Sequence, residues 1–399
     1  MSIYAKKPTF LSLFSGCGGF DQGFEDSGFE CLGAFDNDPI VLDVYRKNLQ
    51  GQTYLHDLSS NVLPIKYEQN NIDVLIAGSP CQGFSTAGLR DINDPRNKLL
   101  LVGGAIAKII SPKVIICENV MGSLSGSHKI YWDFLNKELT DIGYNVDFIE
   151  CSALDFGLAQ LRKRVFLIAY KGKKISKPKL PFLPSKDLRE ILKDIDNLPN
   201  QNDLIPIVDP KIQLLVKHIL PGQKLCNVRG GENSVHTWDI PEVFGEVTEK
   251  ERIVLNTIKN LRRKIRVRSS GDADPVMLKD IEDSCSFPVS SLIISLIGKG
   301  FVRKINDKYD IKNAYNGLYK RLDWNKWSMT VDTQFGNPRY FLHPEEDRGM
   351  SVREAARIQG FSDNFIFHGS VKQKFKMIGN AVPPPIAAGI SDYIKHNLL

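Results

Sequence analysis

The sequence of 399 residues lacks the features that mark secreted, membrane-spanning or disulfide-stabilised proteins. Its seven cysteines are scattered and include no Cys-x-x-Cys pair, so neither a disulfide framework nor a zinc site is favoured, and we expect no metal. The N-terminus has no apolar signal core. The longest apolar run, 99–117, is interrupted by Lys108, Pro112 and Lys113 and is not a membrane span. These absences predict a cytoplasmic protein that keeps its thiols reduced.

The sequence also lacks a strong charge imbalance, an internal repeat and a low-complexity tract. Charged residues make up 25% and hydrophobic residues 42%, which is ordinary for a globular protein. The net charge of +6 leans only mildly towards an anionic partner. The length is sufficient for two or three domains.

The first 170 residues contain strand and helix patterns in regular alternation. We predict strands at 10–14, 31–35, 72–77, 113–117, 144–151 and 165–170, with helices that include 99–110 and 131–142. This alternation predicts a doubly wound, mostly parallel sheet. In such folds, ligands bind at the carboxyl ends of the strands.

The first predicted strand runs into a glycine turn, Ser15-Gly16-Cys17-Gly18-Gly19, as at the start of a nucleotide-binding unit. Its G-x-G-G spacing is not the G-x-G-x-x-G fingerprint, which disfavours a nicotinamide oxidoreductase. Asp36 ends the second strand, where such folds bind ribose hydroxyls, although a helix cap is a common alternative. Asp38 fits the cap better, because Pro39 suits the first helical position.

A cysteine, Cys81, follows the predicted strand at 72–77 in a loop rich in Gly and Ser. Such a thiol can be reached by a substrate and act as a nucleophile, but a buried, inert cysteine is the more common case. Glu118 ends another strand, and Arg162 and Arg164 precede the last one. From these residues alone, a structural ion pair between Glu118 and Arg164 is as good an interpretation as a catalytic pair.

At Lys171 the sequence becomes basic and proline-rich, which indicates a domain boundary, and β–α alternation is absent from about 175 to 350. Thr248 and Glu251 form a capping-box pattern at the start of a helix. The segment 252–268 contains seven Lys or Arg and no acid. Such a run is more often a solvated face, but helix patterns at 274–283 and 290–298 and short strands at 301–305 and 309–311 follow it. This order is typical of a winged helix-turn-helix, whose usual partner is DNA.

Six motifs occur in an order that resembles the DNA cytosine-5 methyltransferases of prokaryotic restriction–modification type. They are FSGCGG, PCQ, ENV, Q-x-R-x-R (Gln160 to Arg164), R-E-x-A-R-x-Q-G-F (353–361) and GNAVPP, and they cover about 1–170 and 350–399. The resemblance implies a Rossmann-like, S-adenosylmethionine-dependent catalytic domain formed by 1–172 with 370–399. It also implies a smaller target recognition domain, 173–369, in which the winged helix would span about 245–312.

The resemblance assigns catalytic roles. Cys81 would add as a thiolate to C6 of a flipped cytosine, so that C5 becomes nucleophilic enough to take a methyl group. Glu118 would contact N3 and the exocyclic amine through a carboxyl held near its protonated form. Arg164 would hold O2 and orient Glu118, with assistance from Arg162, and Asn119 would brace the loop.

The resemblance also assigns binding roles. The expected cofactor residues are Phe14, Gly16, Gly18, Gly19, Asp36, Asn37, Asp57, Leu58, Pro80, Leu99, Asn380 and Val382. Asn37 replaces an aromatic residue common in the family, so adenine stacking would fall to Phe14 or Pro39. The expected DNA-binding residues are Gln82, Ser85 and Arg90 in a loop that closes over the base, Arg262, Arg263, Arg266 and Arg268 in the basic run, and Thr330.

The expected partner is duplex DNA, and a restriction endonuclease would act separately. We expect no membrane association, a monomer, and a location in the prokaryotic cytoplasm or nucleoid. Two alternatives use the same fold: an RNA cytosine-5 methyltransferase and a non-catalytic DNA-binding protein. A winged helix favours duplex DNA, because the major groove of A-form RNA cannot be read. The presence of Cys81, Glu118 and Arg164 together argues against a non-catalytic protein.

Overall fold

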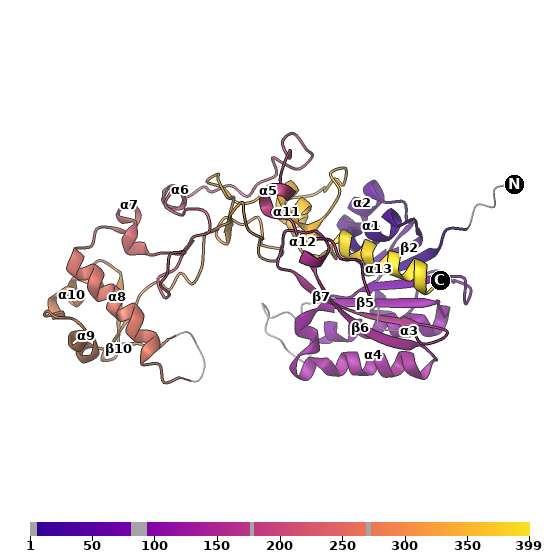
Figure 1. Cartoon of the computed structure of the whole chain (residues 1–399), viewed down its shortest axis with the longest axis horizontal. Coiled ribbons are helices and arrows are strands. Elements are labelled where there is room, and N and C mark those ends of the chain that lie inside the picture. Colours follow the sequence, from indigo (N-terminus) through magenta and orange to yellow (C-terminus); the bar gives the residue numbers. More distant parts are fainter. Residues whose placement is uncertain (1–5, 81–93, 176–178, 269–272) are drawn as a thin grey trace. The chain divides into compact units, whose positions relative to one another are not determined.

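The computed structural model describes residues 6–80, 94–175, 179–268 and 273–399 (Figure 1). The chain divides into two compact units. Unit 1 comprises Met1–Asp203, Asn325–Phe335 and Ser351–Leu399, and unit 2 comprises Leu204–Trp324 and Gly336–Met350. In sequence, unit 2 is therefore an insertion within unit 1.

Unit 1 includes residues 173–203 and 351–369, which the predicted boundaries grouped with the recognition domain. Helix α5 (Leu188–Ile191) contacts α11 (Val352–Gln359). The buried Arg353 donates from its guanidinium to the carbonyl oxygens of Pro199, Ser362 and Phe365 at 2.6–3.0 Å. These bonds join the two segments within unit 1.

Unit 1 is built on a seven-stranded sheet in the order β3-β2-β1-β4-β5-β7-β6. The strands are β1 (Thr9–Leu13), β2 (Glu30–Asp36), β3 (Thr53–Leu55), β4 (Val74–Gly78), β5 (Val114–Val120), β6 (Asn145–Ser152) and β7 (Lys163–Tyr170). Strands β1 to β5 pair in parallel, and β7 runs antiparallel to both β5 and β6. The predicted doubly wound, mostly parallel sheet is confirmed.

Helices cover both faces of this sheet (Figure 1), with α1, α2 and α13 on one face and α3 and α4 on the other. They are α1 (Gly19–Asp26), α2 (Pro39–Asn48), α3 (Val102–Ile110), α4 (Lys129–Asp141) and α13 (Pro384–Asn397), and α12 (Val371–Asn380) precedes α13. The predicted cap at Asp38 is confirmed, since its side chain accepts a hydrogen bond from the Ile40 N–H and Pro39 begins α2.

Helices α1 and α13 approach so closely that only glycine fits between them. A Cβ atom on Gly23 would lie 2.4 Å from the Pro384 carbonyl oxygen and 2.5 Å from the Ala387 Cβ. One on Gly19 would lie 2.7 Å from the Val382 carbonyl oxygen. The segment that leads into α13 therefore packs directly on the start of α1.

Unit 2 contains the expected three helices and β-ribbon. They are α8 (Glu249–Lys264), α9 (Leu278–Ser284), α10 (Ser290–Gly298), β11 (Val302–Ile305) and β12 (Lys308–Ile311). A short strand that the sequence did not predict, β10 (Val276–Met277), completes an antiparallel sheet in the order β10-β12-β11. The order helix–strand–helix–helix–strand–strand is that of a winged helix. The predicted capping box between Thr248 and Glu251 is also confirmed.

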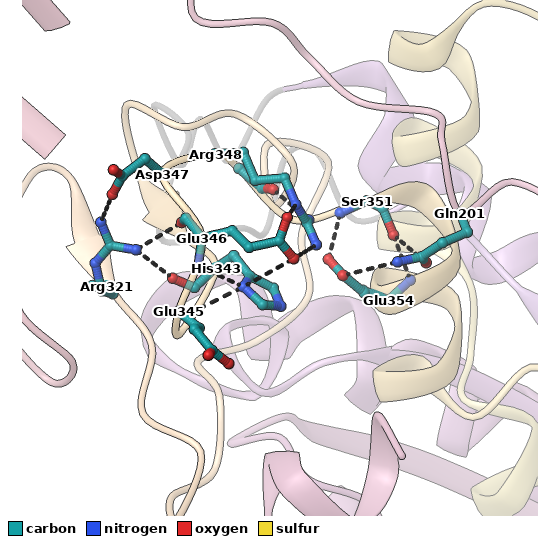
Figure 2. Close-up of polar contacts among 10 residues, drawn as sticks. Gln201, Arg321, His343, Glu345, Glu346, Asp347, Arg348, Ser351 and Glu354 are labelled. Atoms are coloured by element: carbon teal, nitrogen blue, oxygen red, sulfur yellow. Dashed lines mark hydrogen bonds and ion pairs between the residues drawn. The ribbon is translucent and has the colours of Figure 1, made fainter. Parts of the chain in front are cut away.

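The rest of unit 2 has short elements: α6 (Pro210–Lys217), α7 (Pro241–Phe244), β8 (Lys224–Leu225), β9 (Ser234–Val235), β13 (Lys320–Arg321) and β14 (Phe341–Leu342). Buried Arg321, on β13, connects α6 to the segment after β14. Its guanidinium donates to the Val216 carbonyl oxygen of α6, and also to the His343 and Glu346 carbonyl oxygens and the Asp347 carboxylate (Figure 2). In unit 1, Ser351 and Glu354 form the capping box of α11, and Gln201 bonds to both side chains (Figure 2).

Within the described residues, no helix is both long and apolar enough to cross a bilayer.

We predict that Gly23→Ala destabilises the protein by ~1–3 kcal/mol, because the new methyl group must displace the backbone of α13. The measurement is a denaturant unfolding curve of the full chain. Gly298→Ala serves as the control, because a Cβ atom there meets nothing within 4 Å. An equal effect of the two substitutions would contradict the close α1–α13 packing.

Candidate active site

The carboxyl ends of the parallel strands of unit 1 open onto a cavity of about 330 Å³. This volume is within the ~300–1,000 Å³ that is typical of small-molecule sites. The predicted residues that line it are Phe14, Gly16, Gly19, Asp36, Asn37, Asp57, Leu58, Pro80, Leu99, Glu118, Arg164, Asn380 and Val382. The structure thus brings together residues that are widely separated in the sequence.

The glycine turn needs backbone conformations that L-residues rarely adopt. Phe14, Gly16 and Gly18 have φ angles of 55°, 56° and 94°. Left-handed conformations at non-glycine residues such as Phe14 tend to occur at functional sites. Gly18 does not line the cavity in the described part of the chain. A Cβ atom there would lie 2.2 Å from the Leu49 side chain, so this glycine permits close packing behind the turn.

Asp36 connects the end of β2 to this turn. One carboxylate oxygen accepts a hydrogen bond from the Gly16 N–H and the other accepts one from the Asp38 N–H, both at 2.9 Å. Burial raises the pKa of Asp36 above its ordinary value, although these two bonds oppose the shift. Because each carboxylate oxygen can accept a second bond, Asp36 is able to receive hydroxyl donors from the cavity.

Glu118 and Arg164 form a buried ion pair in the cavity wall. Val120 on β5 is opposite Arg164 on the antiparallel strand β7, so Glu118 and Arg164 are diagonal neighbours on one face of the sheet. The Arg164 Nε and Glu118 Oε1 atoms are 2.8 Å apart. Burial raises the pKa of Glu118, and the positive charges of Arg164 and Arg162 reduce that rise. The carboxyl is therefore poised to hold a proton more readily than an exposed glutamate.

Asn119 braces the segment between β4 and Cys81. Its amide nitrogen donates to the Ser79 carbonyl oxygen at 3.3 Å and to the Ser79 hydroxyl at 3.1 Å. Its oxygen accepts a hydrogen bond from the Val120 N–H at 2.8 Å. Pro80, the residue before Cys81, lies on the cavity wall.

Four predicted site residues lie outside the described part of the chain: Cys81, Gln82, Ser85 and Arg90.

A family model for the C-5 cytosine-specific DNA methylases matches residues 8–396. The chain belongs to this family. The match spans both units, and it confirms the family that the six ordered motifs predicted. The protein is thus a DNA cytosine-5-methyltransferase.

Individual relatives match this methylase along nearly its whole length. The Type II methyltransferase M.NlaIV of Neisseria lactamica is 30% identical, over 98% of this chain and 99% of its own. M.FnuDI of Fusobacterium nucleatum is 31% identical, over 97% of this chain and 94% of its own. Among solved structures, the Entamoeba histolytica methyltransferase EhMeth has a TM-score of 0.55 at 19% identity and covers 99% of this chain and 100% of that one. This last likeness shows the fold.

Arg162 is completely buried in the methylase and is not among the described residues that line the cavity. Its guanidinium donates to the carbonyl oxygens of Val331, Gly379 and Ala381 at 2.8–3.1 Å. Arg162 thereby holds the segment that carries Asn380 and Val382.

Sequence reasoning missed part of the cavity wall. Ile40, Val41 and His56 line it next to the predicted acids, and Gln373, Lys376 and Met377 line it from α12. Of the two candidates for adenine stacking, Phe14 lines the cavity and Pro39 does not. The sequence does contain a signal for the start of α12, since Ser370 and Gln373 have the spacing of a capping box and form one in the structure.

The predicted DNA-binding side chains differ in exposure. Arg262 is buried in the winged helix, where it pairs with Asp310. Arg263, Arg266 and Arg268 are exposed, and Arg268 pairs with Asp274. Thr330, in unit 1, donates from its hydroxyl to the Leu161 carbonyl oxygen at 2.8 Å.

Among the described residues, no group of three or more His, Cys, Asp or Glu side chains is placed to hold a metal ion.

A second buried carboxyl lies behind the glycine turn. Asp21 is fully buried and accepts hydrogen bonds from the Ser12 hydroxyl at 2.9 Å and the Tyr45 hydroxyl at 2.8 Å. Burial raises its pKa from 3.8 to about 7, although the two hydroxyls oppose the shift. The folded state therefore keeps a proton on Asp21 that the unfolded state loses above pH 3.8.

This carboxyl predicts a pH dependence of stability. Because the pKa is higher in the folded state, the free energy of unfolding should fall as pH rises from about 4 to about 7, by up to ~1.4 kcal/mol per pH unit. Asp21→Asn should remove this slope in urea unfolding curves, whereas Asp141→Asn, on the exposed end of α4, should keep it. Identical slopes for Asp21→Asn and the unsubstituted protein would show that Asp21 ionises normally.

Proposed function

We propose that this methylase transfers a methyl group to C5 of one cytosine in a specific duplex DNA sequence, with Cys81 as the nucleophile and S-adenosylmethionine as the methyl donor. The observation that carries the proposal is the buried Glu118–Arg164 pair in the wall of the same cavity as the glycine turn and Pro80. Glu118, Arg164 and the residues expected to bind the cofactor therefore line one cavity, in which they could contact the same flipped cytosine.

The cavity suits the chemistry of S-adenosylmethionine. Asp36 and Asp57 offer carboxylates for the ribose hydroxyls and the adenine end, and Leu58, Leu99 and Val382 offer apolar surface. Gly16 and Gly19 allow close approach of the backbone to a ligand. When bound there, S-adenosylmethionine supplies an electrophilic methyl group on its sulfonium.

Cytosine C5 is a poor nucleophile until the ring loses its aromaticity. We infer that the Cys81 thiolate forms a bond to C6 while Glu118 donates a hydrogen bond, or its proton, to N3. C5 then carries the electron pair that takes the methyl group. Methyl transfer leaves the sulfonium sulfur as a neutral thioether. Loss of the C5 proton to a base and return of the N3 proton to Glu118 then let the C6–sulfur bond break, which restores the aromatic ring and the thiolate.

The other cysteines of unit 1 are poor candidates for this role. Cys17 also lines the cavity, but burial raises its pKa to about 12. Burial likewise raises the pKa values of Cys117 and Cys151 to about 12, and that of Cys31 well above its ordinary value. A thiol with such a pKa supplies almost no thiolate near neutral pH. This supports the assignment of the nucleophile to Cys81.

We assign target recognition mainly to unit 2, the part of the predicted recognition domain at 173–369 that forms a separate compact unit. The target base must leave the duplex to reach Cys81, and Gln82, Ser85 and Arg90 would close over it. Arg263, Arg266, Arg268 and Thr330 would contact the DNA backbone, which positions the protein without reading sequence. Arg262 is better explained as a structural residue, because its partner Asp310 is also buried.

We further propose that the methylase protects DNA in a restriction–modification system, as the Type II designation of its relatives suggests. A cognate endonuclease would act separately on the same sequence. The methylase would act as a monomer in the prokaryotic cytoplasm, where its DNA substrate lies.

A duplex with 5-fluorocytosine at the target should trap a covalent adduct on Cys81, because fluorine cannot leave C5 as a proton does. Bisulfite sequencing of a plasmid grown with the protein identifies the target, and peptide mapping identifies the attached residue. Cys81→Ala should abolish the adduct and turnover while cofactor binding persists, and Cys285→Ala, in unit 2, should retain both.

An adduct mapped to Cys17 would refute this assignment. Methyl transfer to a matched RNA, with none to DNA, would instead favour an RNA substrate.

Glu118→Gln should lower kcat by ~10²–10⁴-fold, because glutamine can donate a hydrogen bond but cannot transfer a proton. Burial raises the pKa of Glu118, so kcat/KM should fall as pH rises through that pKa, and the variant should lack this alkaline limb. Glu150→Gln, on the exposed side of β6, is the control. Retention of the limb in Glu118→Gln would assign it to another group.

A further inference from the structure

In this winged helix, α9 and α10, the helix pair that normally contacts DNA, carry few positive charges. In the helix-turn-helix class the second helix of the pair, here α10, enters the major groove. Helix α10 contains no Lys or Arg, and its exposed side chains include Ser290, Ser291, Ile294 and Ile297. Helix α9 carries one lysine, Lys279, against three acids. A face with so few cations would contribute little binding free energy through contacts with DNA phosphates.

A basic cleft lies elsewhere in the same unit. It is formed by the loop around residues 228–230 and by the C-terminal half of α8, and its lining includes Arg229, Lys259, Asn260, Arg263 and Lys264. Among the described residues, the cleft lining includes no acid. Cations in the last turn of α8 also offset the helix dipole, but Arg229 and Lys259 lie outside that turn.

Lys259 is a buried cation with a prearranged position. Its ammonium group contacts His236 Nε2 at 3.1 Å and donates to the Asn256 side-chain oxygen at 2.9 Å. His236 Nδ1 is 2.9 Å from the Asp239 carboxylate, which in turn pairs with Arg252. His236 Nε2 also lies 3.2 Å from the Arg229 carbonyl oxygen, so these contacts tie Lys259 to the loop around residues 228–230.

The cleft leaves room for an anion at Lys259. Gly230 faces the ammonium, and a Cβ atom at Gly230 would lie 3.6 Å from Lys259 Nζ. An ammonium has three donors, and the described contacts use two of them. Burying a cation is costly unless anions compensate it. The negative charge of Asp239 offsets part of this cost for Lys259, whereas the exposed Arg263 and Lys264 beside the cleft add further positive charge.

We propose that this basic cleft binds a backbone phosphate of the DNA substrate, so that the winged helix docks through α8 instead of α10. The inference rests on the proposed function, since it takes duplex DNA as the substrate. A phosphate held there fixes the register of the recognition unit on the duplex and leaves base reading to other side chains.

The test compares the affinity of the full chain for duplex DNA across salt concentrations. Arg263→Gln and Lys264→Gln should each weaken binding about 3- to 10-fold, and the slope of log K against log[salt] should shrink by ~0.9 for each phosphate that the protein no longer neutralises. Lys279→Gln, which removes one exposed cation from α9, should leave both quantities unchanged. Single-turnover methylation at saturating DNA should be unaffected in Lys279→Gln.

Two substitutions of Gly230 provide a second test with a matched control. Gly230→Ala adds a methyl group at ordinary contact distance and should bind DNA normally. Gly230→Glu places a carboxylate next to Lys259, occupies the anion site and should weaken binding at least tenfold.

Unchanged affinity and salt slope in Arg263→Gln, Lys264→Gln and Gly230→Glu would overturn the proposal. A larger loss of affinity in Lys279→Gln than in Arg263→Gln would overturn it too, in favour of docking through α9 and α10. Failure of the unsubstituted chain to methylate any DNA would instead reject the proposed function.

Discussion

The geometry of the active site depends on buried side chains that hold the backbone of residues 378–381. Arg162 donates to the Gly379 and Ala381 carbonyl oxygens, and Gln359 donates to those of Ile378 and Ala381 at 2.8–3.0 Å. Gln160 joins the same network through Gln359 at 2.7 Å. A buried hydrogen-bond network of this kind makes its surroundings rigid. It holds the backbone of the segment that contributes Asn380 and Val382 to the cavity lining, and Val382 packs against Gly19 of the glycine turn.

The sheet of unit 1 brings the reactive and ligand-binding side chains together next to this hydrogen-bond network. The parallel strands direct Asp36 and Pro80 towards one edge, and the antiparallel strand β7 brings Arg164 to Glu118. Both carboxyls have a raised pKa, but their partners differ. Within the described residues, Asp36 accepts hydrogen bonds from backbone N–H groups and is suited to bind hydroxyls as well. Glu118 is paired with a cation and is suited to hold or release a proton.

Much of the site could be predicted because the sheet obeys simple rules. Acids that follow buried strands meet at one edge, and a glycine turn after a first strand marks the ligand position. The function of Arg162 could not be read, because its partners are backbone carbonyls, which leave no trace in the sequence. The burial of Arg262 could have been inferred, since it lies four residues after the core residue Ile258 on one face of α8. Strand β10 was too short to give a periodic signal, and its pairing with β12 decides its conformation.

The packing of α13 against α1 has a consequence for synthesis on the ribosome. Gly19 and Gly23 are made early, but the residues that press against them, Val382, Pro384 and Ala387, are made more than 350 residues later. The sheet can form while these residues are still being translated, yet the cavity stays open on one side until they arrive. Folding of the cofactor site is therefore a late event, and chains that terminate prematurely, before residue 379, would expose the apolar face of α1 to chaperones and proteases.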